Sequence, residues 1–142
     1  MLNDIMKSLA SERGIRAFTP DEKGAFNIDV DLFSLEIKQR SSWIIWETTL
    51  PFTFAEDLDF QGEQMLKRCM QFSLKTLRDG LNTLTVNNDQ SLVLQAKVGC
   101  EQLSYARFCA LLSQHIDRCE RYSALLTPEG FNHIERHTMW LP

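Results

Sequence analysis

Two histidines near the end of the chain have a spacing that can bind a metal ion. His133 and His137 stand four residues apart with Glu135 between them, and a helix would place both imidazoles on one face. The order is not that of the H-E-x-x-H zinc motif, and no third ligand is evident. We therefore favour a chance pair and expect no metal and no cofactor. A small metal-dependent enzyme that uses these residues with His115 stays open as an alternative.

A second candidate for chemistry is a histidine beside a cysteine. His115 and Cys119 share a face of a predicted helix and could act as base and nucleophile. They lie on its apolar stripe, where packing is the commoner role, and no orienting group or oxyanion donor can be assigned. The cysteines are also too far apart for a C-x-x-C motif, which favours reduced, partly buried thiols over a zinc site or disulfides. They are Cys69, Cys100, Cys109 and Cys119.

Pairs of acidic residues could supply a general acid and a general base. Asp29 and Asp31 form one such pair, and Asp57 and Asp59 form another. Carboxylates on a strand face beside lysines are usually just its solvated side. The chain contains no P-loop, no G-x-G-x-x-G and no G-x-S-x-G motif. We therefore predict that the protein is not an enzyme.

Composition and charge narrow the class of partner. The 142 residues are 44% hydrophobic and 24% charged, and the net charge is −4, from 15 Lys plus Arg against 19 Asp plus Glu. Without a basic run, nucleic acid is an unexpected partner. Apolar runs of about four residues are far too short for membrane insertion, and the start "MLNDIMKSLASERG" lacks the basic and apolar regions of a signal peptide. We expect a cytoplasmic protein.

The N-terminal part of the chain predicts one helix and three strands. Apolar residues recur at helical spacing over residues 2–13, and Gly14 follows as a helix-ending glycine. Opposite phases of alternation before and after Asp31 predict two strands with a tight turn between them. The third strand is "SSWIIWETTLP", residues 41–51, which Pro51 ends. Its four central residues are apolar on both faces, with Trp43 and Ile45 opposite Ile44 and Trp46.

The remaining chain predicts two longer helices around a hairpin. Residues 52–60 are expected to be irregular, and residues 61–80 form a helix that Gly80 stops. The alternating segments around "NND" predict a β-hairpin, with left-handed backbone accommodated by that turn. A helix over 103–126 follows. The order α-β-β-β-α-β-β-α predicts an α+β sandwich with a twisted antiparallel sheet, as one domain over 1–127 and a C-terminal tail over 128–142.

The predicted central helix is apolar over about half of its circumference. This exceeds the arc of about 100° with which a helix rests on one core. One side carries Met65, Cys69 and Phe72, and the adjoining side carries Leu66, Met70, Leu74 and Leu77. With the two-faced tryptophan strand, this excess predicts a protein-binding dimer rather than a closed monomer.

The order of elements and several segments resemble a known family, the class I chaperones of bacterial type III secretion (CesT/SycE-like). The resemblance runs from about Leu2 to Leu126. It rests on the first helix ending in "ERGI", on "FTPDEKGAFNIDVD", on "EQMLKRCMQFSLKTL" and on "LNTLTVNNDQSLVLQAKV". These signatures are diffuse, and the tail from Pro128 onward has no counterpart in the family.

The resemblance implies a bacterial chaperone without ATPase activity. Its dimer would hold the N-terminal part of a secreted effector or secretion-apparatus protein in a soluble, non-globular form. Self-pairing is expected, with a heterodimer with a second chaperone as the other possibility; a structural or regulatory subunit of the secretion machinery is a further alternative. The implied dimer interface is Met65, Cys69, Phe72, Leu84 and Val86. The implied client-binding residues are Leu2, Ile5, Met6, Trp43 and Ile45.

Overall fold

The fold is an α+β arrangement, described here by a computed structural model for residues 1–79 and 81–127. The helices are α1 (Leu2–Glu12), α2 (Phe54–Asp57), α3 (Phe60–Thr76) and α4 (Tyr105–Leu125), with 3₁₀ turns η1 (Leu77–Asp79) and η2 (Cys100–Gln102). The strands are β1 (Phe26–Val30), β2 (Phe33–Arg40), β3 (Trp43–Thr53), β4 (Asn82–Val86) and β5 (Ser91–Gly99). The predicted order of the main elements is confirmed. His133, Glu135 and His137 lie outside the described residues, so the metal hypothesis is not tested at them.

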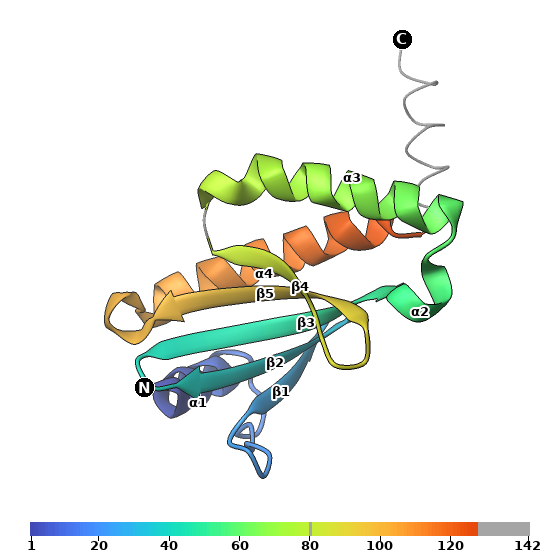
Figure 1. The fold of residues 1–142 in the computed structure, drawn as a ribbon. Helices are drawn as coiled ribbons and strands as arrows, with labels where there is room; N and C mark the ends of the chain where they lie inside the picture. The colour runs from blue at the N-terminus through green and yellow to red at the C-terminus, as the bar shows by residue number, and fades with distance from the viewer. Residues whose placement is uncertain (80, 128–142) are drawn as a thin grey trace.

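A five-stranded antiparallel sheet forms the centre of the molecule, in the order β1-β2-β3-β5-β4 (Figure 1). Helices α1 and α4 lie on one side of this sheet, and α3 rests on the second half of α4 and beside β4. We call the side with the helices the inner face and the other side the outer face. Inner-face residues of the strands are buried, whereas most outer-face residues are exposed or half-buried.

The inner face contributes to two adjoining apolar cores. The first lies between α1, the first half of α4 and strands β1, β2, β3 and β5, and it includes Ile44 and Trp46. The second lies between α3, the second half of α4 and the other ends of β3 and β5, and it includes Phe52 and Tyr122. Because α4 contributes to both cores, it connects α3 to the rest of the protomer.

Three predicted turns are present, with one difference in detail. Gly14 has a φ of +64°, and the backbone N–H of Ile15 donates to the carbonyl of Ala10 at 3.0 Å, which closes the end of α1 as expected. The β1–β2 turn has Asp31 in the left-handed region, at φ +55°. In the β4–β5 turn the left-handed residue is Gln90, not a residue of "NND".

The expected end of the third strand at Pro51 is wrong. β3 continues to Thr53, and the register with β5 shifts between Thr49 and Thr53. Proline cannot donate to a sheet ladder, and an irregularity of this kind accommodates it without breaking the strand. The expected irregular segment over 52–60 is correspondingly shorter, since α2 also forms within it.

The start of α3 is fixed by a cap and by close packing. The Asp59 carboxylate accepts a hydrogen bond from the backbone N–H of Gly62 at 2.7 Å, as an N-cap residue does. Gly62 also lies so close to the end of α2 that a Cβ there would be 1.5 Å from the carbonyl oxygen of Asp57. Glycine is therefore required at this junction.

Candidate protein-binding surfaces

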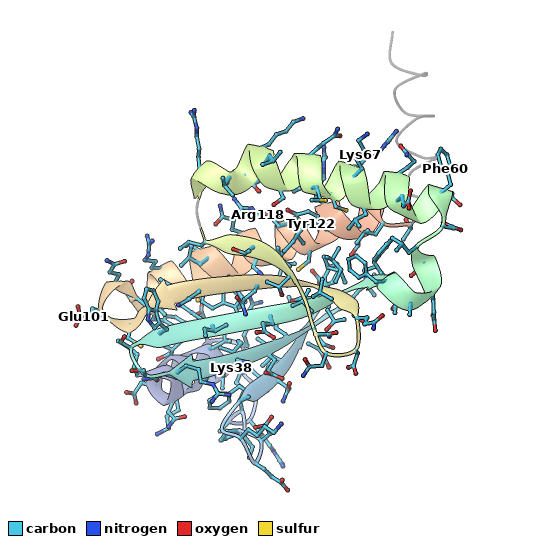
Figure 2. All side chains as sticks on the ribbon, viewed as in Figure 1. Lys38, Phe60, Lys67, Glu101, Arg118 and Tyr122 are labelled. Atoms are coloured by element: carbon cyan, nitrogen blue, oxygen red, sulfur yellow. The ribbon has the colours of Figure 1, made fainter. Side chains whose placement is uncertain are left out.

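The three α3 residues expected at a dimer interface face the interior of the protomer instead. Met65 is 6% exposed and Cys69 is fully buried, both within the second core. Phe72 is half-buried and packs edge-to-face on Tyr122 of α4, with 5.0 Å between ring centroids; Figure 2 shows Tyr122 between the two helices. These side chains therefore hold α3 onto α4, with Met65 and Cys69 in the interior and Phe72 partly exposed beside them.

The exposed apolar surface of α3 lies about a third of a turn further around the helix. Met70 and Leu74 of α3 are 59% and 71% exposed, and Leu77 at the start of η1 is 65% exposed. Leu66 continues their line toward the helix N-terminus and is half-buried. We call these four residues the α3 stripe. Such a line of exposed apolar residues on one helix marks a protein-binding surface.

The other two expected interface residues lie on the edge strand β4. Leu84 is half-buried against the second core, and Val86 is 53% exposed. β4 pairs only with β5, so its outer edge has no partner strand among the described residues. The edge of β4 is therefore accessible near α3, which packs beside it.

The α1 residues expected to contact a client are core residues. Leu2, Ile5 and Met6 are 3%, 4% and 1% exposed and pack on the inner face of the sheet. The backbone N–H of Leu2 also donates to the side-chain oxygen of Gln39 on β2, at 3.2 Å. We therefore remove these three residues from the predicted client surface, since a client could reach them only if α1 moved.

Trp43 and Ile45 do lie on the outer face, opposite the buried Ile44 and Trp46. Trp43 is 43% exposed and Ile45 is half-buried. The ammonium group of Lys97 lies 4.2 Å from the centre of a Trp43 ring, which is a cation–π contact. The second apolar side of the tryptophan strand is therefore only partly covered by the protomer itself.

The next row of the outer face is anionic. The register places Glu36 of β2 directly opposite Glu47 of β3. The Lys38 ammonium lies 3.4 Å from a Glu36 oxygen and 3.6 Å from a Glu47 oxygen, and Gln95 donates to Glu47 at 2.8 Å. The outer face therefore changes along β3 from aromatic and cationic near Trp43 to acidic near Glu47.

His115 has a structural environment, not a catalytic one. It is fully buried, and Asn82 Oδ1 and Thr48 Oγ1 lie 3.0 and 2.9 Å from its Nδ1 and Nε2. An amide oxygen can only accept, so Nδ1 carries the proton and donates to Asn82, while Nε2 accepts from the Thr48 hydroxyl. Burial, with repulsion from Arg118, lowers the pKa of His115 from 6.5 to about 4. The neutral ring thus links α4 to β3 and β4.

The cysteines and acidic pairs have equally ordinary roles. Burial raises the pKa of Cys69 to about 12 and that of Cys119 to about 11, so neither is a thiolate nucleophile at neutral pH. All four cysteines are free thiols, as expected.

One residue of each acidic pair makes a local hydrogen bond. Asp29 accepts from the Ser34 hydroxyl at 2.6 Å, and Asp57 accepts from the backbone N–H of Thr53 at 2.9 Å.

Two further classes of site are absent from the residues that the structure covers. Within 1–79 and 81–127, no three His, Cys, Asp or Glu side chains come together as a metal site would require. In the same residues, no helix has the length and apolar character needed to span a membrane.

The expected interface residues lie on the side of α3 that packs on α4, and the exposed apolar residues lie further around the helix. The charged residues of the sequence contain a signal for this difference. The family resemblance implies an interface at Met65, Cys69 and Phe72, which the fold packs against α4. The charged residues of α3 provide a better guide, because they centre on the side opposite Cys69, and the side opposite the charges of an amphipathic helix is the buried one. They are Glu63, Lys67, Arg68 and Lys75, and Figure 2 shows Lys67 pointing away from the sheet.

A sheet covered on one face only, with an exposed apolar helix stripe, defines a small α+β protein-binding protomer. The same fold occurs in solved protein complexes. The chain of the ExsC–ExsE complex superposes with a TM-score of 0.72 at 18% identity, covering 89% of this chain and 94% of that one. The HopA1–SchA chaperone–effector complex gives 0.70 at 11% identity, covering 86% and 92%.

Comparison of sequences gives the family. The chain belongs to the Tir chaperone protein (CesT) family, whose model matches residues 4–123. It is also similar to the chaperone protein YscB of Yersinia enterocolitica and of Yersinia pestis, with 20% identity over 127 residues, which is 89% of this chain and 93% of either relative. The family resemblance inferred from the sequence is therefore confirmed.

Proposed function

We propose that the protein is a type III secretion chaperone that binds the N-terminal segment of a secreted effector or apparatus protein. It would keep this segment soluble and non-globular in the bacterial cytoplasm, without catalytic activity of its own. Membership of the CesT family supports the proposal, as do the chaperone–effector complexes among proteins of the same fold. The structural observation that carries it is the apolar surface that one protomer leaves exposed, on the α3 stripe and around Trp43.

The two exposed surfaces are assigned different roles. The α3 stripe follows one side of α3 into η1, which suits a helix of a second chaperone protomer, in the simplest case a copy of this chain. The outer face of the sheet is broad, mostly polar and only locally apolar, which suits an extended segment. Ordering such a segment costs about 2 to 5 kcal/mol, which contacts spread along it must offset.

Assembly is tested by placing charges on the α3 stripe. The double substitution Met70→Asp and Leu74→Asp should raise the dimer dissociation constant by at least about 100-fold, because burying an unpaired carboxylate costs several kcal/mol. Sedimentation equilibrium measures this. The matched control is Gln64→Asp with Gln71→Asp, which adds the same charges on the same helix beside the stripe. A wild-type protein that stays monomeric at high concentration would contradict self-pairing.

Client binding is tested by co-expression. The N-terminal segment of a secreted protein of the same system should be soluble with the chaperone and aggregate without it. A protease should also degrade the bound segment in the complex only slowly, yielding protected fragments. If no such segment gains solubility or protection, the protein is not an effector chaperone.

A further inference from the structure

The acidic row of the outer face is unfavourable as it stands. Glu36 and Glu47 are directly opposite each other on neighbouring strands and on the same side of the sheet. Like charges in this position destabilise a sheet. Lys38 is shared between the two carboxylates at 3.4 and 3.6 Å, and it neutralises only one of them. The Glu36 side chain remains 44% exposed. A second cation would therefore be accommodated favourably at this row.

A hollow of about 430 Å³ opens beside this row, between the β1–β2 turn and the β4–β5 turn. Its lining includes Leu32, Glu36, Glu47, Thr49, Asn87 and Val93. None of the described residues that line it is Lys or Arg. The hollow therefore combines an apolar surface with two carboxylates that share one lysine, Lys38.

Each of the two turns that border the hollow carries an acidic residue that does not itself line it. Asp31 precedes Leu32, which is 96% exposed at the tip of the first turn. In the second turn, the backbone N–H of Asp89 donates to the side chain of Asn87 at 3.0 Å. Leu32 thus provides an exposed apolar side chain at the rim of the hollow.

We propose that this hollow binds a lysine or arginine side chain of the client's extended segment, with apolar residues next to it in the sequence. The inference rests on the proposed chaperone function and specifies which segment the outer face selects. The aliphatic stem of the side chain would lie on Leu32, which is 96% exposed, and its cationic head would lie between the carboxylates of Glu36 and Glu47. Neighbouring apolar residues of the segment would extend along the sheet toward Ile45 and Trp43.

Charge complementarity favours a basic side chain in the hollow over an acidic or a purely apolar one. A long basic side chain can bury its methylene groups while its charge meets carboxylates, so both parts of the hollow are used. An acidic segment would bring like charges together on a protein that already carries −4. A purely apolar segment would leave the carboxylates desolvated without a partner.

The test uses a short acetylated peptide in which lysine alternates with valine and serine, and a counterpart with glutamate at each lysine position. Titration of the folded, isotope-labelled protein should shift the backbone amide signals of Leu32, Glu36, Glu47 and Val93 with the lysine peptide only. Affinity measured by fluorescence anisotropy should fall as salt rises, because ions screen exposed charge pairs. Equal binding of both peptides, or shifts confined to other surfaces, would overturn the inference.

A pair of matched variants separates local from overall charge. Glu36→Gln with Glu47→Gln should weaken the lysine peptide about tenfold, as loss of charge-assisted contacts does. Asp117→Asn with Glu120→Gln removes the same charge from exposed positions of α4 and should change affinity less than twofold. Equal effects of the two pairs would show that only overall charge matters.

Failure of the inference about the hollow can be distinguished from failure of the proposed chaperone function. If a client is kept soluble equally well by the Glu36→Gln, Glu47→Gln variant and its basic residues can be replaced without effect, the inference fails and the chaperone function stands. If no client is found but the lysine peptide binds at the hollow, the proposed function fails and the chemistry of the hollow stands.

Discussion

Replacing His115 should remove a defined part of the pH dependence of stability. The ring is neutral and fully buried, and its pKa is lowered from 6.5 to about 4. A base with a lowered pKa binds fewer protons in the folded than in the unfolded state, so its stabilisation is complete above pH 6.5 and is lost as pH falls toward 4. At about 1.4 kcal/mol per pH unit, the full loss is about 3 kcal/mol, of which about 2 kcal/mol is lost by pH 5.

The assay is urea unfolding at constant protein concentration, followed by circular dichroism between pH 7 and pH 5. The variant His115→Gln keeps a donor and an acceptor but cannot titrate, so its free energy of unfolding should lose about 2 kcal/mol less than the wild type over this range. Parallel curves for wild type and His115→Gln would refute the reasoning.

Two further predictions concern buried positions. Gly62→Ala should destabilise the protein by about 2 kcal/mol or more, because the alanine Cβ would collide with the Asp57 carbonyl. The effect is opposite to the usual preference of helices for alanine over glycine. Thermal unfolding measures it, and Gly99→Ala, where the nearest atom to the added Cβ is 4.0 Å away, is the nearly neutral control. Iodoacetamide at pH 8 should modify the half-buried Cys100 and Cys109 before the buried Cys69 and Cys119. Burial disfavours the reactive thiolate form of Cys69 and Cys119. Mass spectrometry of timed samples measures the order of modification, and equal rates at all four thiols would contradict the prediction.

Most of the fold could be predicted from the sequence because its elements are locally encoded. Alternation of apolar and polar residues specifies β1 and β2, and the helix-ending glycine at position 14 has the left-handed backbone expected of it. The errors occur where neighbouring strands override a local rule. Pro51 ends no strand, because β3 is held by its long pairing with β5 and the shift in register accommodates the proline.

The binding surfaces were harder to predict because exposure depends on which elements pack together. Leu2, Ile5 and Met6 form an apolar stripe in the sequence, and only the fold shows that the sheet and α4 cover it. The acidic hollow has no signature in the sequence at all. Glu36 and Glu47 are brought face to face only by the β2–β3 register.

The contact between Lys97 and Trp43 gives this molecule a natural optical reporter. Trp43 stands in a polar setting under an ammonium group, whereas Trp46 is enclosed next to Phe108. A polypeptide that settles over the first indole has to displace the lysine and exclude water from the ring, and both events alter its fluorescence. In a variant in which Trp140, the third tryptophan, is replaced by phenylalanine, occupancy of this end of the sheet can therefore be followed in real time without attaching a dye.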